Sequence, residues 1–333
     1  MGKLRIGIAG ATGAVGTTLL ELFIAHQDPV EIVCYASAKS AGKTLTCKDQ
    51  DFVLQPFDVE HAASCDVVFL CVSGDFSLEY GPLLAKNSTV IDNSSAFRYD
   101  PEVPLIVPPV NPHSFTGQTL IANPNCSSAI ALVVLAPLHR QYGIEHLTLS
   151  TYQAASGAGK PAMEELVART GAFKDYDRTF KSDYFRHDLA YNVVPHIDQF
   201  QANRYTKEEM KMVWEIRKVL EAPDMPIEAT AVRVPALRSH AESLSIKFTQ
   251  PVTSLDAVRS LLAADANVEV RDDIENNVYP MPVTSTYKHA VEVGRIRHSL
   301  VYGEYGLNLF VSGDQLLRGA ALNAYEIYKL VYK

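Results

Sequence analysis

Hydrophobic positions in the first 128 residues form short apolar runs that alternate with helical segments. The run 67–70 is apolar without a break, which is typical of a parallel strand buried on both faces. Such alternation predicts a parallel sheet covered by helices. The predicted strands are 4–9, 31–35, 66–72, 89–92 and 119–122, and a helix over 15–25 follows the first of them.

From about residue 144 the pattern changes to longer strand-like runs, which predict a second domain with a mixed or antiparallel sheet. Its predicted strands are 146–152, 229–234, 243–248, 291–297 and 307–311. A helix is predicted over 206–220, with Thr206 as its N-cap and Glu209 as the capping-box partner. A second helix is predicted over 316–331. Residues 174–191 are polar and aromatic without periodicity, so we expect a long loop there.

The composition is that of an ordinary globular protein. Of 333 residues, 47% are hydrophobic and 20% charged, and the net charge is −8 without a basic cluster, which argues against a nucleic-acid partner. No apolar run reaches the roughly 18 residues of a membrane span, and no signal peptide is recognisable. The five scattered cysteines form neither a disulfide framework nor a paired zinc spacing. We therefore expect a cytoplasmic protein without a membrane partner or a metal.

A glycine-rich turn follows the first predicted strand and opens the first predicted helix. Glycines let the backbone approach a pyrophosphate, and a helix N-terminus offers free N–H groups and a partial positive charge. The spacing is Gly-x-x-Gly-x-x-Gly, and such turns also occur for steric reasons alone. The context of strand and helix favours a nucleotide site formed by Gly10, Thr12, Gly13, Ala14, Val15 and Gly16.

The end of the second predicted strand distinguishes the two nicotinamide cofactors. An NAD enzyme usually carries an acidic residue there to hold the ribose 2′-hydroxyl. This chain has no acid between residues 36 and 43, but it has Ser37, Lys39 and Ser40. These side chains could bind a 2′-phosphate, which a carboxylate would repel. The pattern favours NADP over NAD, the alternative being a solvated basic loop without a ligand.

Cys126 stands in the polar segment 123–128, which precedes the apolar helix-like run 129–138, so it is expected at a helix N-terminus. A helix N-terminus stabilises a thiolate and lowers the pKa of a thiol, and a thiolate can attack an acyl carbon to form a thioester. The alternative is a buried, inert cysteine. That alternative suits Cys34, Cys65 and Cys71, which lie in or beside apolar strands, better than Cys126, which has polar neighbours on both sides. Cys47 is placed in a polar loop without an evident partner.

Several motifs in the same order closely resemble the aspartate-semialdehyde dehydrogenase family, and the resemblance runs over nearly the whole chain. The matching segments are 10–16, 92–98, 123–127, 150–159, 192–198, 233–240, 293–297 and 313–321. The resemblance implies NADPH-dependent reduction of L-4-aspartyl phosphate to L-aspartate 4-semialdehyde with release of phosphate. This step belongs to lysine, diaminopimelate, threonine and methionine biosynthesis. It also implies a homodimer, with the choice between dimer and tetramer left open.

The same resemblance assigns roles to residues. Cys126 matches the nucleophile, His240 the acid/base residue and Gln153 the residue that orients the acyl group. Arg233 matches the arginine that binds the substrate α-carboxylate, and Glu208 an acid that helps to hold the substrate. Phosphate-binding positions are matched by Arg98, Asn125 and Lys211, and further cofactor contacts by Gly157 and Gln315.

With the resemblance, the fold class becomes α/β: a doubly wound Rossmann-type nucleotide domain (residues 1–128 and 312–333) with an inserted α+β substrate and dimerisation domain (129–311). Three alternatives stay open. N-acetyl-γ-glutamyl-phosphate reductase shares the architecture and thiol chemistry, with a longer acylated substrate. An inactive nucleotide-binding paralogue would keep the fold without the chemistry. A glyceraldehyde-phosphate-type dehydrogenase shares the thioester step, but its motifs differ around Cys126 and Arg233.

Overall fold

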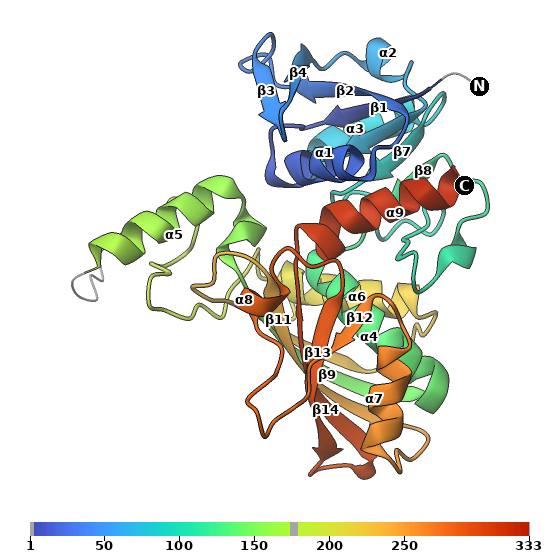
Figure 1. Ribbon diagram of the computed structural model, residues 1–333, viewed down its shortest axis with the longest axis vertical. Helices are drawn as coiled ribbons and strands as arrows, with labels where there is room; N and C mark the ends of the chain where they lie inside the picture. Colours follow the sequence, from blue (N-terminus) through green and yellow to red (C-terminus); the bar gives the residue numbers. More distant parts are fainter. Residues whose placement is uncertain (1–2, 174–178, 333) are drawn as a thin grey trace. The chain divides into compact units, whose positions relative to one another are not determined.

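The computed structural model describes residues 3–173 and 179–332, and the chain divides into two compact units (Figure 1). Unit 1 comprises residues 1–125 and 320–333, and unit 2 comprises residues 126–319. The chain therefore enters unit 2 once and returns to unit 1 for its last helix. The predicted domain boundaries after residues 128 and 311 stay predictions.

Unit 1 contains a six-stranded sheet in the order β5-β2-β1-β6-β7-β8, and all its strand pairs are parallel. The five predicted strands all form, joined by the very short β5. Their bounds are β1 (Leu4–Ala9), β2 (Val30–Ala36), β5 (Gln55–Pro56), β6 (Val67–Leu70), β7 (Thr89–Asp92) and β8 (Leu120–Ala122). All four residues of β6 are completely buried, as expected for a central parallel strand.

Successive side chains of a strand point to opposite faces of the sheet, so the apolar strands present hydrophobic side chains on both faces. Helices cover both of these faces. Phe69 of β6 packs edge-on against Phe23 and near Tyr328, in helices α1 and α9. Val68 and Leu70 join the apolar cluster on the other face, beside helices α2 and α3. The helices are α1 (Ala14–His26), α2 (Val59–Ala62), α3 (Gly74–Leu84) and α9 (Leu322–Val331). The predicted doubly wound fold is confirmed.

A small antiparallel hairpin, β3 (Thr44–Cys47) and β4 (Gln50–Val53), follows β2. The prediction that Cys47 lies in a polar loop is wrong, because Cys47 ends β3 with its side chain buried. The predicted C-terminal helix begins as a π-helical segment over Leu317–Ala321 and continues as α9. π-Helical turns of this kind are often found at functional sites.

Unit 2 contains a mixed six-stranded sheet in the order β10-β9-β11-β14-β13-β12. β9 runs parallel to β10 but antiparallel to β11, and β14 is antiparallel to both β11 and β13. All five predicted strands form, together with the short β12. The bounds are β9 (Ile144–Gln153), β10 (Ile227–Arg233), β11 (His240–Phe248), β12 (Val268–Val270), β13 (Val291–Ser299) and β14 (Gly303–Gly313).

The main helix of unit 2 is α4 (Cys126–Tyr142), which packs against the sheet and against α6 (Lys207–Val219) and α7 (Leu255–Ala263). The predicted capping box of α6 is confirmed. The backbone N–H of Glu209 donates to the Thr206 hydroxyl over 3.2 Å, and the Glu209 carboxylate accepts from the Thr206 N–H over 2.6 Å. The other Glu209 oxygen accepts from the N–H of Ala231 in β10, so this cap also ties the helix to the sheet.

Helix α5 (Lys160–Ala172) was not predicted, because only Ala162 and Leu166 of its residues are buried and the apolar pattern is weak. Residues 179–191 form turns and irregular chain, as predicted for the long loop, while 174–178 lie outside the described residues. Within residues 3–173 and 179–332, no helix is both long and apolar enough to span a bilayer.

Candidate active site

Three strand ends bring polar side chains together at one edge of the unit 2 sheet. β9 ends at Gln153 and the parallel β10 ends at Arg233, which is its direct partner in the sheet register. The antiparallel β11 begins at His240, so its first residue lies beside the last residue of β9. All three side chains are buried, with exposed fractions of 1% for Gln153, 7% for Arg233 and 0% for His240.

The hydrogen bonds of His240 determine which ring nitrogen carries the proton. The backbone N–H of Ala154 donates to His240 Nδ1 over 3.1 Å. Because a peptide N–H can only donate, Nδ1 must be unprotonated and the neutral ring must carry its hydrogen on Nε2. Nε2 lies 3.5 Å from Gln153 Nε2, which is a donor itself when its amide oxygen accepts from Thr151. The His240 Nε2–H is thus available to a substrate.

Burial and a neighbouring cation both favour the neutral form of His240. Burial first, and then the charge of Arg233, lower the pKa of His240 to about 3, against smaller opposing effects of Glu208 and of the Ser239 backbone. Burial also lowers the pKa of Arg233, partly offset by Glu208 and by Cys126. An arginine stays protonated throughout the physiological range, so the site holds a fixed positive charge beside a neutral imidazole.

A chain of hydrogen bonds extends from Gln153 to helix α6. The Gln153 amide nitrogen donates to Glu208 over 3.2 Å, and its oxygen accepts from the Thr151 hydroxyl over 3.0 Å. Lys211, one turn after Glu208 on the same face of α6, donates to Glu208 over 3.0 Å and to Asp198 over 2.8 Å. Burial alone would lower the pKa of Lys211, but these two carboxylates raise it overall.

Cys126 is the first residue of α4, as predicted. From Ile121 to Leu138 every residue is buried except Cys126, which is partly exposed. The first turn of α4 contains no acidic side chain, and His139 and Arg140 lie in its last turn, which is the charge distribution that a helix dipole favours. Its thiol interacts electrostatically with Arg233. These features argue against the alternative of a sealed, inert cysteine.

Two glycines make room for the reactive side chains. A Cβ atom on Gly157 would lie 2.9 Å from a terminal nitrogen of Arg233 and 3.3 Å from His240 Nε2. A Cβ atom on Gly319 would lie 2.7 Å from the Cβ atom of Cys126 and 2.9 Å from its Cα atom. Real Cβ atoms essentially never approach other atoms to less than 3.0 Å, so a larger residue at position 319 would displace Cys126, and one at position 157 would push the Arg233 side chain aside. Gly157 therefore packs directly over the histidine and the arginine.

Gln315 joins two segments of this site. Its amide oxygen accepts from the backbone N–H of Ser239 over 2.7 Å, and its amide nitrogen donates to the Ser156 hydroxyl. Ser239 has a left-handed backbone with φ of +67° and precedes His240, while Ser156 precedes Gly157. Both functional groups of the Gln315 amide are thus engaged within unit 2, and its predicted contact with a cofactor stays a prediction.

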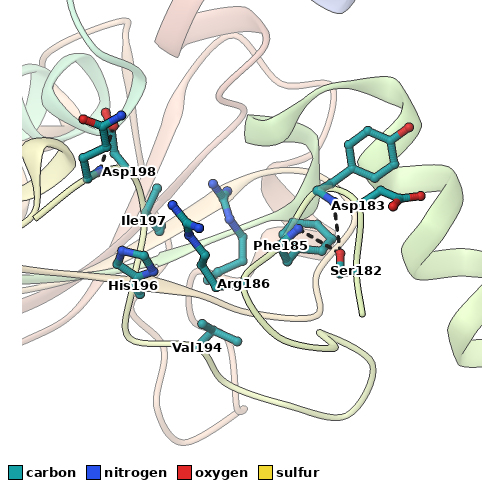
Figure 2. Close-up of a pocket in the computed structure, with 11 residues that line it drawn as sticks. Ser182, Asp183, Phe185, Arg186, Val194, His196, Ile197 and Asp198 are labelled. Carbon is teal, nitrogen blue, oxygen red and sulfur yellow. Dashed lines mark hydrogen bonds between the residues drawn. The ribbon is translucent and has the colours of Figure 1, made fainter. Parts of the chain in front are cut away.

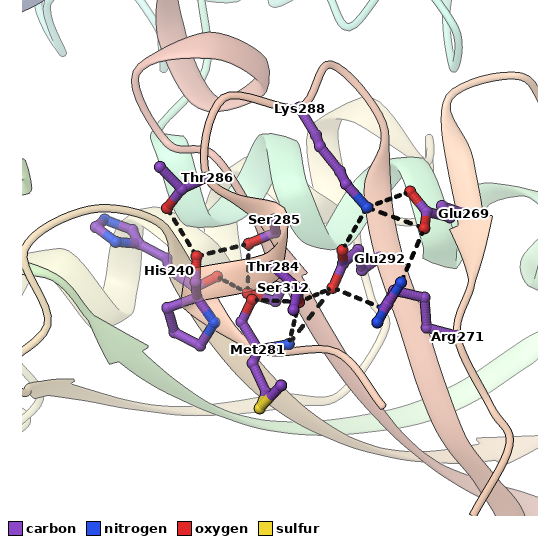
Figure 3. Close-up of polar contacts among 11 residues, drawn as sticks. His240, Glu269, Arg271, Met281, Thr284, Ser285, Thr286, Lys288, Glu292 and Ser312 are labelled. Atoms are coloured by element: carbon purple, nitrogen blue, oxygen red, sulfur yellow. Dashed lines mark hydrogen bonds and ion pairs between the residues drawn. The ribbon is translucent and has the colours of Figure 1, made fainter. Parts of the chain in front are cut away.

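A polar network behind β11 also holds the backbone around His240 (Figure 3). Helix α8 (Pro282–Ser285) and Thr286 carry it. The Thr286 hydroxyl contacts the Ser239 hydroxyl at 2.9 Å, and Ser285 contacts Ser312, whose hydroxyl donates to the His240 carbonyl oxygen over 3.2 Å. Farther along, the fully buried Glu292 accepts from Thr284 and Lys288. The buried charge is therefore paired, and the helix that it anchors supports the histidine.

The predicted nucleotide turn lies in unit 1, directly after β1. At this strand the order of the sheet changes direction, because the next strands along the chain are added first on one side of β1 and then on the other. β1 has β2 on one side and β6 on the other, and open α/β sheets bind ligands at such a point. Gly10 has φ of +83°, and a Cβ atom there would lie 2.2 Å from the Cys71 carbonyl oxygen. A Cβ on Gly16 would lie 2.4 Å from the Gly10 oxygen. Only glycine fits either position.

The same turn leaves the N-terminus of α1 open to an anion. Gly13 is the N-cap, offers no side-chain cap, and is exposed together with Thr12. No acidic residue stands in the first turn. Ser37 and Lys39, after β2, are exposed and Ser40 is partly so. Among the described residues, no side-chain hydrogen bond or ion pair occupies these three polar groups. This arrangement fits a phosphorylated dinucleotide.

Arg98 and Asn125 belong to unit 1, where both are buried. Arg98 donates to the carbonyl oxygens of Asn123 over 2.8 Å and of Asn93 over 2.9 Å, which holds its guanidinium against the segment that leads to Cys126. Their roles in phosphate binding stay predictions. Burial raises the pKa of the other four cysteines, to about 12 for Cys34 and Cys71.

Three supporting residues escaped the sequence analysis. Asp198 pairs with Lys211, and the Ser156 hydroxyl receives the Gln315 amide. Asp314 is fully buried and accepts from Arg238 over 2.7 Å and from the backbone of Tyr287. Asp198 and Asp314 stand in the motifs 192–198 and 313–321, so a polar residue inside such a motif was the available signal. Within the described residues, no three potential metal ligands are grouped.

Two family profiles match the chain, and together they define a two-domain semialdehyde dehydrogenase. Residues 5–118 match "Semialdehyde dehydrogenase, NAD binding domain", and residues 135–318 match "Semialdehyde dehydrogenase, dimerisation domain". Aspartate-semialdehyde dehydrogenase of Aquifex aeolicus is 41% identical, covering 99% of this chain and 98% of that protein. The Synechocystis protein of that name is 40% identical over 98% of this chain and 97% of its own length. The chain belongs to the aspartate-semialdehyde dehydrogenase family.

Solved structures agree with this assignment. Aspartate semialdehyde dehydrogenase II of Vibrio cholerae, crystallised in complex with ASA, is 35% identical with a TM-score of 0.92, covering 100% of this chain and 99% of its own. The Candida albicans enzyme, solved with NADP, is 25% identical with a TM-score of 0.78, covering 99% and 98%. The chain is therefore an oxidoreductase with a nicotinamide-cofactor domain. These relatives do not favour the N-acetyl-γ-glutamyl-phosphate reductase alternative.

Proposed function

We propose that this protein reduces L-4-aspartyl phosphate to L-aspartate 4-semialdehyde with NADPH, through a thioester on Cys126, and releases inorganic phosphate. The observation that carries the proposal is the edge of the unit 2 sheet, where Gln153, Arg233 and His240 meet and where Arg233 interacts with the thiol of Cys126. The product would serve lysine, diaminopimelate, threonine and methionine biosynthesis.

Cys126 is the nucleophile in this proposal. Its thiolate attacks the acyl carbon, the bond from that carbon to the phosphate oxygen breaks, and the acyl group stays on sulfur as a thioester. The thiol is partly exposed at a helix N-terminus, and a buried arginine lies within its electrostatic range. The Gln153 amide, held between Thr151 and Glu208, has a fixed orientation from which it can align the acyl group.

His240 acts here as a hydrogen-bond donor through Nε2. Reduction of the thioester places negative charge on the former carbonyl oxygen, and a donor that already points there stabilises this charge. The bond from the Ala154 N–H to Nδ1 fixes the required tautomer, and the lowered pKa keeps the ring neutral before the reaction. Collapse of the tetrahedral species releases the aldehyde and restores the thiolate. If Nε2 gives its proton to this oxygen, it takes the proton back when the carbonyl group re-forms, and in the opposite direction the same donor stabilises the oxyanion that thiolate attack on the aldehyde produces.

Charged residues position the two ends of the substrate. Arg233 binds the α-carboxylate, since a planar guanidinium pairs with a carboxylate through two parallel hydrogen bonds. Glu208 faces the same site and helps to hold the substrate. Arg98, Asn125 and Lys211 bind the phosphoryl group and the departing phosphate. Lys211 is paired with two carboxylates and so would bind phosphate by exchanging part of this pairing.

NADP is the proposed cofactor, and when bound it supplies the hydride for the reduction. The turn from Gly10 to Gly16, with Thr12, Gly13, Ala14 and Val15, would hold the pyrophosphate against the start of α1. Ser37, Lys39 and Ser40 would hold the 2′-phosphate, because their polar groups are exposed and no carboxylate lies between residues 36 and 43. Gly157 and Gln315 are proposed as contacts near the nicotinamide.

A homodimer is the proposed assembly, with a tetramer as a possible higher form. The support is the match of residues 135–318 to a dimerisation domain, which covers most of unit 2. We further propose that residues 1–128 with 312–333 carry the cofactor and that residues 129–311 carry the substrate and the dimer contacts. Sedimentation velocity should show twice the mass of one chain, whereas a monomer at micromolar concentration would contradict the dimer.

The direct test is reduction of NADP⁺ by L-aspartate semialdehyde in the presence of inorganic phosphate. We expect turnover that depends on phosphate and that stops after iodoacetamide treatment, with mass spectrometry placing the label on Cys126. The semialdehyde of N-acetylglutamate, which has a longer acylated chain, should react far more slowly. Turnover that needs no phosphate, or that survives complete labelling of Cys126, would contradict the proposed mechanism.

A further inference from the structure

A cavity of about 450 Å³ opens beside the strand end that carries Arg233, in unit 2 (Figure 2). Its walls come from the segment after α5 and from the segment that leads to α6. The residues important here are Tyr184, Phe185, Arg186, His196, Asp198 and Arg233. Gln153, His240 and Cys126 are not among its lining residues, so Arg233 is the residue of that group that the cavity shares with the candidate active site.

Arg233 presents unused donors at this cavity. Its Nη1 donates to the Ala154 carbonyl oxygen over 2.7 Å, and among the described residues no other hydrogen bond or ion pair of its guanidinium is found. The side chain is only 7% exposed, yet it is part of the cavity wall. The remaining N–H groups of Arg233 are not among the buried polar atoms that lack a partner in the described chain, so they can donate to an anion in the cavity.

Arg186 contributes a second guanidinium to the same cavity. Arg186 lines the cavity together with His196 and Ile197 (Figure 2). Within the described chain, Arg186 takes part in no hydrogen bond or ion pair. Its segment is nevertheless anchored, because Glu165 of α5 accepts from the Ser182 hydroxyl and, over 3.0 Å, from the backbone N–H of Asp183.

The charges around the cavity favour an anion. Of its two carboxylates, Asp198 is committed to Lys211 at 2.8 Å. The carboxylate of Asp183 points away from Arg186 in Figure 2. Two arginines without carboxylate partners therefore face one space, and guanidinium groups match the planar, two-oxygen geometry of a carboxylate.

We propose that Arg186 is a second substrate-binding arginine, which contacts the free α-carboxylate from the side opposite to Arg233. The inference rests on the proposed function, in which Arg233 binds that carboxylate near the thiol. A second cation would then select amino-acid aldehydes and acyl phosphates that carry a carboxylate at this end. It would act on substrate binding, because it lies away from the reacting atoms.

The test compares two aldehydes in the full-length protein. L-aspartate semialdehyde carries the α-carboxylate, and 3-aminopropanal is the same aldehyde without it. The Arg186→Gln variant should raise KM for L-aspartate semialdehyde up to about five-fold, the effect of one ion pair at an exposed position. Its kcat should stay unchanged, and kcat/KM for 3-aminopropanal should not fall. Arg186→Lys keeps the charge without the planar fork and should show an intermediate KM.

Lys181→Gln is the matched control, since it removes one positive charge from the same exposed segment without touching the cavity. Its KM for L-aspartate semialdehyde should equal that of the unmodified protein. An unchanged KM in Arg186→Gln would overturn the inference, as would an equal change for 3-aminopropanal or in Lys181→Gln. Absence of turnover in the unmodified protein would instead overturn the proposed function, and this inference with it.

Discussion

The two units build their candidate sites from different parts of the chain. In unit 1 the nucleotide turn consists of backbone N–H groups and glycines, and Gly10 and Gly16 are required because carbonyl oxygens occupy the space of a side chain. In unit 2 the site consists of buried ionisable side chains at strand ends, each held by one or two hydrogen bonds. One site depends on the shape of the main chain and the other on electrostatics in a buried environment.

This difference determines how each site should respond to change. A backbone site tolerates side-chain replacement wherever the φ angle and the available space allow it. A site of buried charges is sensitive to the loss of any partner, because the remaining group keeps its desolvation cost without compensation. At the candidate site of unit 2, burial acts on the pKa values of His240, Arg233 and Lys211 together.

The largest expected effect removes the chemistry of unit 2 and leaves the nucleotide binding of unit 1 in place. Cys126→Ser should lower kcat by about 10⁴-fold or more, because a neutral hydroxyl replaces the thiolate that forms the thioester. Binding of NADPH, followed by calorimetry, should remain within about two-fold, since the nucleotide turn lies in unit 1. Turnover close to that of the unmodified protein would remove Cys126 from the mechanism.

The second prediction concerns pH and His240. In the unfolded state His240 binds a proton near pH 6.5, whereas in the folded state it does so only near pH 3. The free energy of unfolding therefore decreases as the pH falls from 6.5 to 3. The slope is about 1.4 kcal/mol per pH unit for this group. His240→Asn keeps an acceptor for the Ala154 N–H but cannot titrate.

Urea unfolding at pH 6 and pH 4 should therefore show that the unmodified protein loses about 3 kcal/mol more than His240→Asn over this interval. Above pH 7 the two proteins should show no such difference in slope. Equal losses in both proteins would mean that His240 titrates normally in the fold, which would contradict the neutral Nε2–H tautomer as well.

The third prediction tests the glycine turn of unit 1. Gly10→Ala should cost about 2 kcal/mol of unfolding free energy and weaken NADPH binding, because φ is +83° and the new Cβ would meet the Cys71 oxygen. Gly42→Ala is the control, since φ there is +78° but no atom lies within 4 Å of the new Cβ. Thermal unfolding should rank Gly10→Ala below Gly42→Ala. The reverse order would show that close packing is unimportant at this turn.

The smallest effect is expected at the edge of the cofactor site. Lys39→Gln should raise KM for NADPH about ten-fold at low ionic strength and leave KM for NADH unchanged, because only the former carries the 2′-phosphate. Lys43→Gln, a few residues farther along the same exposed segment, is a suitable control. A parallel loss for both cofactors would show that Lys39 does not recognise the 2′-phosphate, and the preference for NADP would then need another basis.

Local signals account for the parts of the fold that could be predicted. The strand, the glycine turn and the helix that begins at Ala14 are contiguous, and the Thr206–Glu209 capping box lies within four residues, so neighbouring side chains decide both. Helix α5 was missed because only two of its residues are buried. Cys47 was misplaced because its polar neighbours conceal a hairpin whose one buried position it occupies.

The candidate site was predicted as a set of residue types, and its roles came from resemblance to a family. The residues from Ser37 to Ser40 and the position of Cys126 before a helix were interpretable from charge and helix geometry alone. Arg186 gave no signal, because an exposed arginine in an irregular segment has no characteristic pattern. Only the cavity that it shares with Arg233 makes it a candidate.

The sequence by itself determined the glycine turn, the position of Cys126 at the start of α4, and the two hydrophobic patterns that distinguish the units. Each of these depends on residues that are adjacent along the chain. The tertiary structure decided which proton His240 carries and what Arg233 faces. Gln153, Arg233 and His240 meet only through the pairing of β9 with β10 and β11. The Ala154 N–H reaches His240 across 86 residues of chain, and the burial that keeps this ring neutral exists only in the folded core.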